Sequence, residues 1–376
     1  MNPTKHSEQP LLHLLSGNIP PFFAIAIFVA FGIWTTSYTG CLTISLSVSA
    51  MLAFVLSNQN CKTCFILFLA SFIAGGLAYS IQDQGFKNFQ ELFSGKKVQK
   101  IYGVIKDVNK DPHKQFKYKT LIETSTIQTS GENINVSRKI LLFSQENPNV
   151  DVGDFVHLTN SQLSQSRNKS FNRYLEKENI YGTVFTKKAN ISVTGKPAHS
   201  LSRYIWHTKN TILKKIEQKI SPFVFSVFAS IFLGYKHAAP KYTNPIKRSF
   251  LLWGISHYLA RSGLHLVIFL LLWSFFLHLI PIPWRIRETI FILICVSYFC
   301  LSWTSISFFR AFGVFIICKI NSFTGLQTNL FHIISLIATI VLLYNPITLF
   351  FLDFQLSFAL SCALAWLSFF VGHSHR

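Results

Sequence analysis

Acidic residues are scarce in this sequence. It has 15 Asp+Glu against 35 Lys+Arg, so its formal net charge is +20. Charged residues of both signs make up only 13% of the chain, whereas hydrophobic residues make up 50% and the mean hydropathy is +0.35. Soluble domains carry about 25% charged residues, so this balance argues against an ordinary soluble protein and indicates a membrane protein.

The basic charge is spread over both halves of the chain. Residues 82–221 have 23 Lys+Arg against 12 Asp+Glu, and residues 222–376 have 10 against 2. Such a surplus suits anionic lipid headgroups and nucleic-acid phosphates equally, and the positive-inside bias of membrane proteins would also produce it. Charge alone therefore leaves membrane lipids and nucleic acid as alternative partners.

Motifs for nucleotide hydrolysis, nucleophilic catalysis and metal binding are also missing. The sequence SGKK at residues 94–97 lacks the upstream glycine and the Ser/Thr of a phosphate-binding loop. No nucleophile motif of the G-x-S-x-G kind occurs. The His-x-His at residues 373–375 is followed by no carboxylates, and seven cysteines do not form a disulfide framework. We therefore expect no enzymatic activity, no cofactor and no metal site.

Three apolar runs open the chain, at residues 22–33, 42–56 and 65–81. Because further apolar runs follow the first, we interpret them as three membrane spans in a domain of residues 1–81 rather than as a signal peptide. With the N-terminus in the cytoplasm, three spans place the next segment outside the cell membrane.

Residues 82–198 predict a small β domain. Short alternating runs separated by turn residues are typical of a compact barrel, and they occur at residues 100–107, 118–123, 140–143, 154–159, 180–186 and 189–194. We expect a partly open OB-like barrel. Five aromatic residues among its lysines are candidates either for stacking with single-stranded DNA or for the core: Phe116, Tyr118, Phe143, Tyr174 and Tyr181.

Residues 199–221 predict an amphipathic basic helix lying on the membrane surface. The apolar run at residues 222–233 is too short to cross a bilayer unaided, so it suggests a re-entrant or interfacial helix. Residues 222–376 as a whole are expected to form a transmembrane domain. The predicted fold class is thus a polytopic α-helical membrane protein with an inserted small all-β domain on the extracytoplasmic side.

Polar residues interrupt the apolar stretch at residues 250–270. If this stretch is one helix, steps of three and four place five residues on one stripe, namely Gly254, His257, Tyr258, Arg261 and His265. Ser256 and Gly263 point the other way. An arginine near the middle of a membrane helix costs about 2.5 to 3.5 kcal/mol on insertion scales, so it should face protein or water. The stripe is our candidate for the wall of a transport pathway.

The acidic residue Asp353 stands at the start of the last apolar run. Because an unpaired buried carboxylate is costly, we expect it to pair with Arg310 or Arg261, which leaves the other arginine able to meet phosphates. A structural clamp between helices is the alternative role for Asp353. Gln355 and Ser357 line the same segment, or only join helices by hydrogen bonds.

Three groups of motifs resemble the ComEC-type competence protein family, the inner-membrane channels of natural DNA uptake. The first is Gly254-Ile255-Ser256-His257 followed by Leu259-Ala260 and Ser262-Gly263-Leu264-His265. The second is the run SISFFRAF around Arg310, and the third is Asn345-Pro346 followed by residues 353–358, DFQLSF. The three apolar runs and the OB-like segment also resemble the N-terminal portion of that family.

This resemblance implies transport of one DNA strand across the cytoplasmic membrane, with other competence proteins such as a DNA receptor and a cytoplasmic motor as partners. The sequence departs from the family pattern at Arg261, where an aliphatic residue is usual, and at Tyr235, where an acidic residue is common. It also lacks the additional spans and the metallo-β-lactamase-like domain of longer members. We therefore expect a second polypeptide or further copies of the chain to complete the channel, or a truncated member.

Two other functions fit the same residues. A transporter of a small anionic solute or lipid would use the same arginines, and a non-conducting membrane assembly subunit would explain the short length. Uptake of labelled DNA compared with small anions separates the first alternative from a DNA channel, and co-purification of a membrane partner supports the second.

Overall fold

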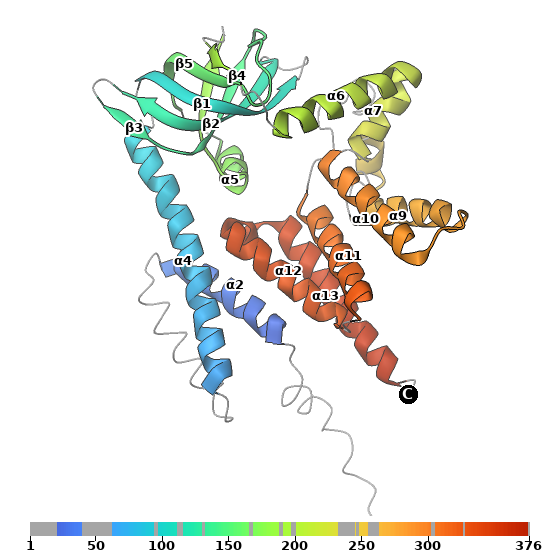
Figure 1. The fold of residues 1–376 in the computed structure, drawn as a ribbon. Helices are drawn as coiled ribbons and strands as arrows, with labels where there is room; N and C mark the ends of the chain where they lie inside the picture. The colour runs from blue at the N-terminus through green and yellow to red at the C-terminus, as the bar shows by residue number, and fades with distance from the viewer. Residues whose placement is uncertain are drawn as a thin grey trace, which may run out of the picture. The chain divides into compact units, whose positions relative to one another are not determined.

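The protein is described from a computed structural model (Figure 1). The structure describes residues 21–39, 62–93, 97–110, 116–129, 132–164, 168–187, 191–196, 201–231, 245, 248–254, 263–301, 305–325 and 328–374. The chain divides into two compact units, residues 1–84 with 309–376 and residues 85–308. Each unit is described by itself.

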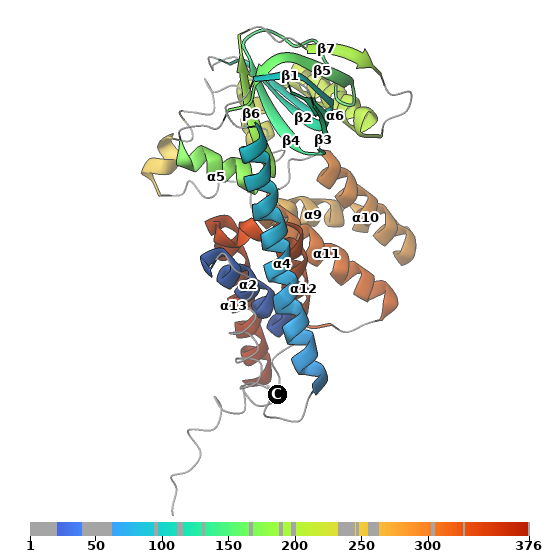
Figure 2. The same cartoon turned by 90° about the vertical axis from the view of Figure 1, so that its left-hand side faces the viewer.

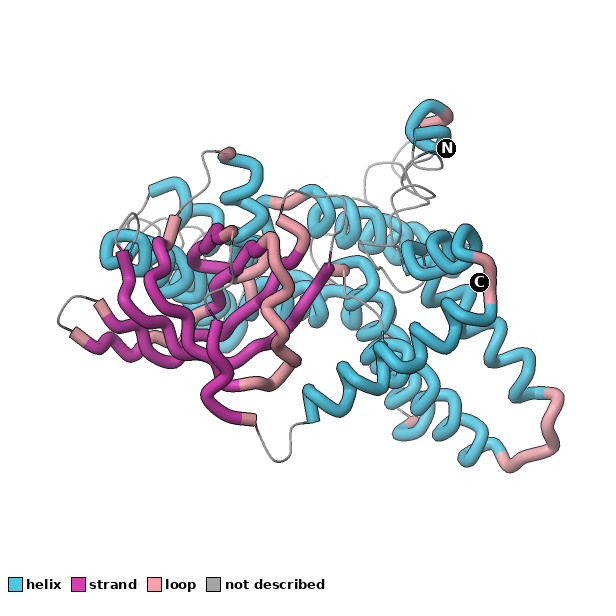
Figure 3. The backbone as a smooth tube through the Cα atoms, turned by 90° about the horizontal axis from the view of Figure 1, so that it is seen from above, coloured by secondary structure: helices cyan, strands magenta, loops and turns pink. Residues whose placement is uncertain are grey.

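The second unit contains one seven-stranded sheet, with strand order β6-β4-β2-β1-β5-β7 and β3 paired to β2. Its strands are β1 (Lys97–Lys110), β2 (Tyr118–Gln128), β3 (Asn133–Asn135), β4 (Lys139–Ser144), β5 (Phe155–Gln162), β6 (Ile180–Thr186) and β7 (Ile191–Gly195). All pairs are antiparallel except β4 with β6, and an isolated bridge joins Ser164, just after β5, to Thr183 of β6. All six predicted strands are present; Figure 3 shows them side by side in magenta.

One face of this sheet forms the core of the second unit. Side chains alternate along a strand, so every second residue of an apolar strand can enter the core. Ile101, Ile105, Ile122, Ile140 and Leu142 have no exposed surface. Helix α4 contributes Phe89 and Phe93 to the same cluster. The sequence pattern predicted the strand residues of this core but not the contribution of the helix.

Helix α5 (Lys169–Lys177) packs on the opposite face and was not predicted. Asn168 caps it, because the Asn168 side chain accepts hydrogen bonds from the backbone N–H groups of Ser170 and Phe171. Leu175 of α5 is buried with Leu141 and Ile180 of the sheet. The cap and this single leucine are the local signals for α5, and nine residues are too few for a clear helical period.

Helix α4 (Lys62–Phe93) extends beyond the predicted third span at residues 65–81. At 1.5 Å per residue, its 32 residues span about 48 Å. Figure 2 shows it as one uninterrupted helix. The boundary between the two units falls within it, at residues 84 and 85. In the second unit, Phe86 of α4 stacks on Tyr181 with ring centroids 4.0 Å apart.

The first unit is helical. It contains α2 (Pro21–Thr39), the first part of α4, α11 (Ile306–Thr324) from Phe309 onward, α12 (Leu330–Tyr344), the short 3-10 helix η2 (Pro346–Phe350) and α13 (Leu352–Ser374). Eight of the 15 residues of α12 are buried. Phe23 of α2 packs against Phe331 of α12 at 4.6 Å between ring centroids. The predicted middle span, residues 42–56, lies outside the described residues.

Two glycines allow α2 and α4 to approach closely. A Cβ atom on Gly32 would lie 2.2 Å from the carbonyl oxygen of Phe72, and one on Gly75 would lie 2.3 Å from that of Val29. Both distances are far below van der Waals contact. Backbone therefore meets backbone at this crossing, as small residues permit in packed membrane helices.

The remaining helices of the second unit are α6 (Leu201–Lys219), α7 (Pro222–Ile231), α9 (Gly263–His278) and α10 (Trp284–Leu301). The predicted helix at residues 199–221 is therefore present, and the run from residue 222 forms a short helix. Phe269 of α9 stacks on Tyr298 of α10 at 4.1 Å between centroids. Pro281 and Pro283 lie in the connection between these two helices.

Two helices among the described residues are long and apolar enough to cross a membrane, Phe22–Thr39 and Ile306–Thr324. Three shorter apolar helices accompany them, His265–His278, Leu330–Tyr344 and Leu352–Leu367. Helix length and composition thus give two candidate spans among the described residues, which is weak evidence for a polytopic protein. The polytopic architecture stays a prediction.

Candidate functional site

Arg310 joins two helices of the first unit. It lies on α11, half-buried, and its Nη1 donates a hydrogen bond to the backbone carbonyl oxygen of Ser357 on α13. Its guanidinium carbon also lies 6.0 Å from the ring centroid of Phe358. A main-chain carbonyl and an aromatic face hold a guanidinium in place without neutralising its charge. Arg310 therefore presents a positioned cation.

The structure places the other predicted residues of α13 close to this contact. The side-chain amide of Gln355 donates to the carbonyl oxygen of Leu349 at 2.9 Å, so it links α13 to η2. The Ser357 hydroxyl oxygen is buried without a hydrogen-bond partner among the described residues. Asp353 lies exposed in the first turn of α13. Two partners were expected for Asp353. Arg310 donates instead to a backbone carbonyl, so the Asp353–Arg310 pair is not formed. Arg261 lies outside the described residues, so the Asp353–Arg261 pair stays a prediction.

A buried amide contact lies on the other side of η2. The Gln82 side chain on α4 donates to the side-chain oxygen of Asn345 at 3.0 Å, and its own oxygen accepts a hydrogen bond from the Ile347 N–H at 3.4 Å. Gln82 and Asn345 are each 8% exposed. Asn345-Pro346 is recognisable as a motif, but its contact with Gln82 could not be predicted, because the 263-residue separation of Gln82 and Asn345 leaves no signal in a single sequence.

Gly254 does not lie in the continuous helix that the polar stripe requires. A helical turn ends at Leu252, and Gly254 has a φ of +70°, which a right-handed helix cannot contain. The Gly254 N–H donates to Leu251, and a Cβ atom at Gly254 would meet nothing within 4 Å. Gly254 thus marks a chain break rather than a site of close packing, so it does not belong to the predicted helical face. The rest of that prediction depends on residues 255–262, which lie outside the described residues.

Two further residues of this stretch lie on α9. Gly263 is its first residue, and His265 is 7% exposed on the first turn. Ser256, His257, Tyr258, Arg261 and Ser262 lie outside the described residues. The lining role proposed for this set therefore stays a prediction.

The five aromatic candidates of the β domain are all half-buried. Contacts with other side chains hold several of them. Tyr181 lies between Phe86 and the guanidinium of Arg138, whose carbon is 4.7 Å from its ring centroid. Tyr174 accepts a hydrogen bond from Lys119 Nζ at 3.3 Å, or donates to it when the amine is neutral. Phe143 stacks on Phe185. Phe185 was missed in the sequence analysis, because alternation along β6 does not distinguish a core face from an outer one.

Burial, and to a smaller extent the carboxylates of Glu178 and Asp107, raise the pKa of the Tyr174 hydroxyl from 10.0 to about 12. Burial also raises the pKa of Asp107, against the opposing effects of a hydrogen bond from Asn109 and the positive charges of Lys209 and Lys119. Tyr174 is therefore a neutral hydrogen-bonding group at physiological pH.

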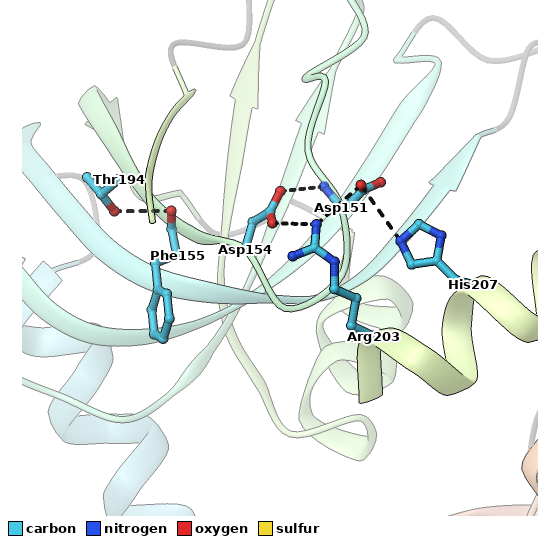
Figure 4. A network of polar contacts seen from close by, with 6 residues as sticks. All are labelled: Asp151, Asp154, Phe155, Thr194, Arg203 and His207. Atoms are coloured by element: carbon cyan, nitrogen blue, oxygen red, sulfur yellow. Dashed lines mark hydrogen bonds and ion pairs between the residues drawn. The ribbon is translucent and has the colours of Figure 1, made fainter. Parts of the chain in front are cut away.

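Helix α6 is docked on the sheet through charged side chains (Figure 4). Arg203 on α6 lies 3.1 Å from Asp154 and 3.5 Å from Asp151, and His207 lies 3.8 Å from Asp151. Trp206 between them packs against the core cluster of the sheet. The prediction that this helix lies on the membrane surface is therefore incomplete. One face contacts the β domain, and Lys214, Lys215 and Lys219 are exposed.

No three His, Cys, Asp or Glu side chains lie close enough to hold one metal ion in the part of the chain that the structure describes. The basic side chains described above instead favour contacts with anions. Arg310 in the first unit and the lysines around the aromatic residues in the second are the candidate groups.

Comparison with known proteins gives one match. No curated protein and no solved structure matches the chain. The sequence model of one family, described as Competence protein, matches residues 231–374, which include α9 to α13 and all the motifs described above from Gly254 to Ser357. Residues 231–374 of this chain are therefore a domain of the Competence protein family, which confirms the ComEC-type resemblance for that segment.

Proposed function

We propose that the protein is a multi-pass subunit of the cytoplasmic membrane that forms part of a channel for uptake of single-stranded DNA in natural transformation. The observation that carries the proposal is Arg310. It lies within the Competence protein domain, on a helix long enough to span a bilayer, and its contact on α13 is a carbonyl oxygen rather than a carboxylate. A cation that keeps its charge within an apolar helix suits passage of phosphates.

The β domain supports the same proposal from outside the bilayer. We propose that its curved sheet is an OB-like barrel on the extracytoplasmic side, with the bridge from Ser164 to Thr183 joining β5 to β6. Such barrels bind single strands by combining basic and aromatic groups. In this mechanism, the β domain collects the strand, and Arg310 with the segment from Gly254 to His265 guides its phosphates.

The test uses Arg310→Ala in cells that take up labelled DNA. Charge-assisted hydrogen bonds contribute about 1.5–3 kcal/mol, so we expect uptake to fall about tenfold to a hundredfold. Arg310→Lys keeps the charge and should retain part of the uptake. The matched control is Arg285→Ala, because Arg285 is exposed at the start of α10. Normal uptake with Arg310→Ala at normal membrane levels of the protein would refute the lining role.

A non-conducting assembly subunit is the second candidate. Five leucines of α13 are exposed at steps of three and four residues, Leu352, Leu356, Leu360, Leu364 and Leu367. Such a stripe fits a neighbouring helix of a second copy or of a complementary membrane subunit. If the protein is reconstituted alone in vesicles and passes neither DNA nor small anions, but co-purifies with a membrane partner, the assembly role is favoured. Passage of small anions without DNA would identify a solute transporter.

A further inference from the structure

Three phenylalanines gather on the sheet at the ends of β4 and β6. Phe143 and Phe185 are directly opposed in the parallel pair β4·β6, and their rings stack at 4.9 Å between centroids with only 6° between their planes. Phe116, just before β2, packs against Phe185 at 5.4 Å and against Phe143 at 6.5 Å. We call these three residues the aromatic surface.

The aromatic surface lies on the face opposite to the core. Leu142 and Val184, the residues preceding Phe143 and Phe185, belong to the core cluster, so the phenylalanines point to the other side. Helix α5 covers part of that side through Leu175 on Leu141. It leaves the Phe185 residue 45% exposed. An aromatic ring already stacked on one neighbour, with so much surface free, can accept a further flat group.

The charge beside the aromatic surface is strongly positive. The segments that form it or flank it are residues 116–119, 139–146, 169–178 and 185–187, and together they hold seven basic residues and three acidic residues, Glu146, Glu176 and Glu178. Lys117 and Lys187 are exposed immediately next to Phe116 and near Phe185. Lys119, in register with Phe143, hydrogen-bonds Tyr174 of α5.

We propose that the aromatic surface binds single-stranded nucleic acid by stacking a base on Phe185, with Lys117 and Lys187 contacting the neighbouring phosphates. Bases stack on exposed aromatic rings irrespective of sequence, and lysines beside them bind the backbone. The proposal rests on the proposed function in DNA uptake and deepens it, because it assigns the binding of the strand to particular residues. A site that stacks bases prefers a strand with bases over one without them, whereas a lysine-rich surface that only attracts phosphate shows no such preference.

The chain supplies a matched control in Phe155. It lies on β5 of the same sheet and is 47% exposed, nearly the same as Phe185. Its surroundings differ, because the next residue is Asp154, and Asp151 lies nearby in the contact with α6 (Figure 4). Replacing Phe155 therefore removes an equally exposed ring on the same sheet, next to carboxylates that are already paired with Arg203.

The experiment measures binding to the full-length protein in detergent micelles by fluorescence anisotropy. One probe is an oligo(dT) of about 16 nucleotides, the upper site size of one OB fold. The other is an abasic strand of the same length, which has the phosphates but no bases. Phe185→Ala should weaken oligo(dT) binding about fivefold to a hundredfold, the range for losing one stacked base, and leave the abasic strand unaffected. Phe185→Trp should bind oligo(dT) like the wild type, and Phe155→Ala should change neither affinity.

Lys187→Ala provides the complementary result. It should weaken both probes equally and reduce the salt dependence of binding, because it removes a phosphate contact. Equal oligo(dT) affinities for Phe185→Ala and Phe155→Ala would overturn the proposal. So would an equal loss for both probes with Phe185→Ala, or a loss of binding to anionic lipid vesicles with oligo(dT) affinity unchanged. Circular dichroism and the thermal midpoint verify that each variant is folded.

The outcome is separable from that of the channel proposal. Binding at equilibrium requires no transport, so Arg310→Ala should retain the preference for oligo(dT) over the abasic strand. A protein that keeps this preference but takes up DNA normally without Arg310 would refute the channel assignment alone. In either case, the stacking proposal requires that Phe185→Ala weaken binding of oligo(dT) and leave binding of the abasic strand unchanged.

Discussion

Two half-buried arginines hold helices in this protein by different chemistry. Arg203, whose side chain is 18% exposed, docks α6 on the sheet through the carboxylates of Asp154 and Asp151. Arg310 joins α11 to α13 through the backbone carbonyl of Ser357 and lies near the ring of Phe358. The first positive charge is neutralised by its partners, and the second keeps its charge. The comparison therefore assigns Arg203 to structure and makes Arg310 the candidate for binding anions.

The strongest test of this comparison neutralises Arg310 without removing it. Ser357→Asp places a carboxylate next to the carbonyl that Arg310 contacts, and the resulting pair would resemble the one at Arg203. If Arg310 acts through its free charge, DNA uptake should fall about tenfold or more, as for loss of the charge-assisted contact itself.

Ser357→Asn is the control, because asparagine has the same shape as aspartate but no charge. It should lower uptake less than Ser357→Asp at the same membrane level. Equal uptake in the two variants would mean that the charge of Arg310 does not matter, and the distinction between the two arginines would then fail.

The second prediction concerns stability at Arg203. Asp154→Ala leaves a mostly buried guanidinium without its 3.1 Å partner, and Asp154 itself is 2% exposed. Breaking a buried pair costs about 3–5 kcal/mol; because Asp151 remains 3.5 Å away, we expect about 2–3 kcal/mol in the free energy of unfolding of this unit. Asp151→Ala should cost less than about 1 kcal/mol, because that carboxylate is 42% exposed. Chemical denaturation followed by Trp206 fluorescence measures both.

The third prediction concerns the uncharged contact between Gln82 and Asn345. Gln82→Leu removes the donor to a buried side-chain oxygen and the acceptor of the Ile347 N–H, which should cost about 1–2 kcal/mol. Gln82→Glu keeps the shape but turns the donor into an acceptor facing the Asn345 oxygen. It should destabilise at least as much as the leucine variant. A glutamate variant as stable as the wild type would contradict the observed hydrogen-bond direction.

Local patterns in the sequence predicted the parts of the fold that depend on them. Alternating residues located the six strands, and the amphipathic period located α6. The contacts of α6 could not be predicted in this way, because Arg203 and Asp154 are 49 residues apart in the sequence and meet only in the tertiary structure. The same applies to Gln82 and Asn345. Hydrophobic periodicity identifies which elements form, whereas the pairing of charges depends on tertiary structure.

The candidate site shows the same division. The motif around Arg310 and the segment with Ser357 were both recognised, but the contact of Arg310 with a backbone carbonyl was not, because a carbonyl oxygen is present at every residue and leaves no signal in the sequence. At Gly254, helical spacing was extended across a residue that adopts a positive φ, which glycine accepts without strain. Phe185 was missed because an outward phenylalanine and an inward one look alike in an alternating strand.

The smallest effect is expected at Tyr174. Like Arg203, this residue of the second unit is influenced by nearby carboxylates, those of Glu178 and Asp107. Its folded-state pKa is raised from 10.0 to about 12, mainly by burial. Because the folded protein holds this proton more tightly than the unfolded chain, the contribution to stability is complete below pH 10 and is lost as the pH rises toward 12. The free energy of unfolding should therefore decline in this window, and Tyr174→Phe should flatten that part of the curve. If the free energy of unfolding of Tyr174→Phe fell with pH as steeply as that of the wild type, other groups, such as the lysines, would control stability at alkaline pH.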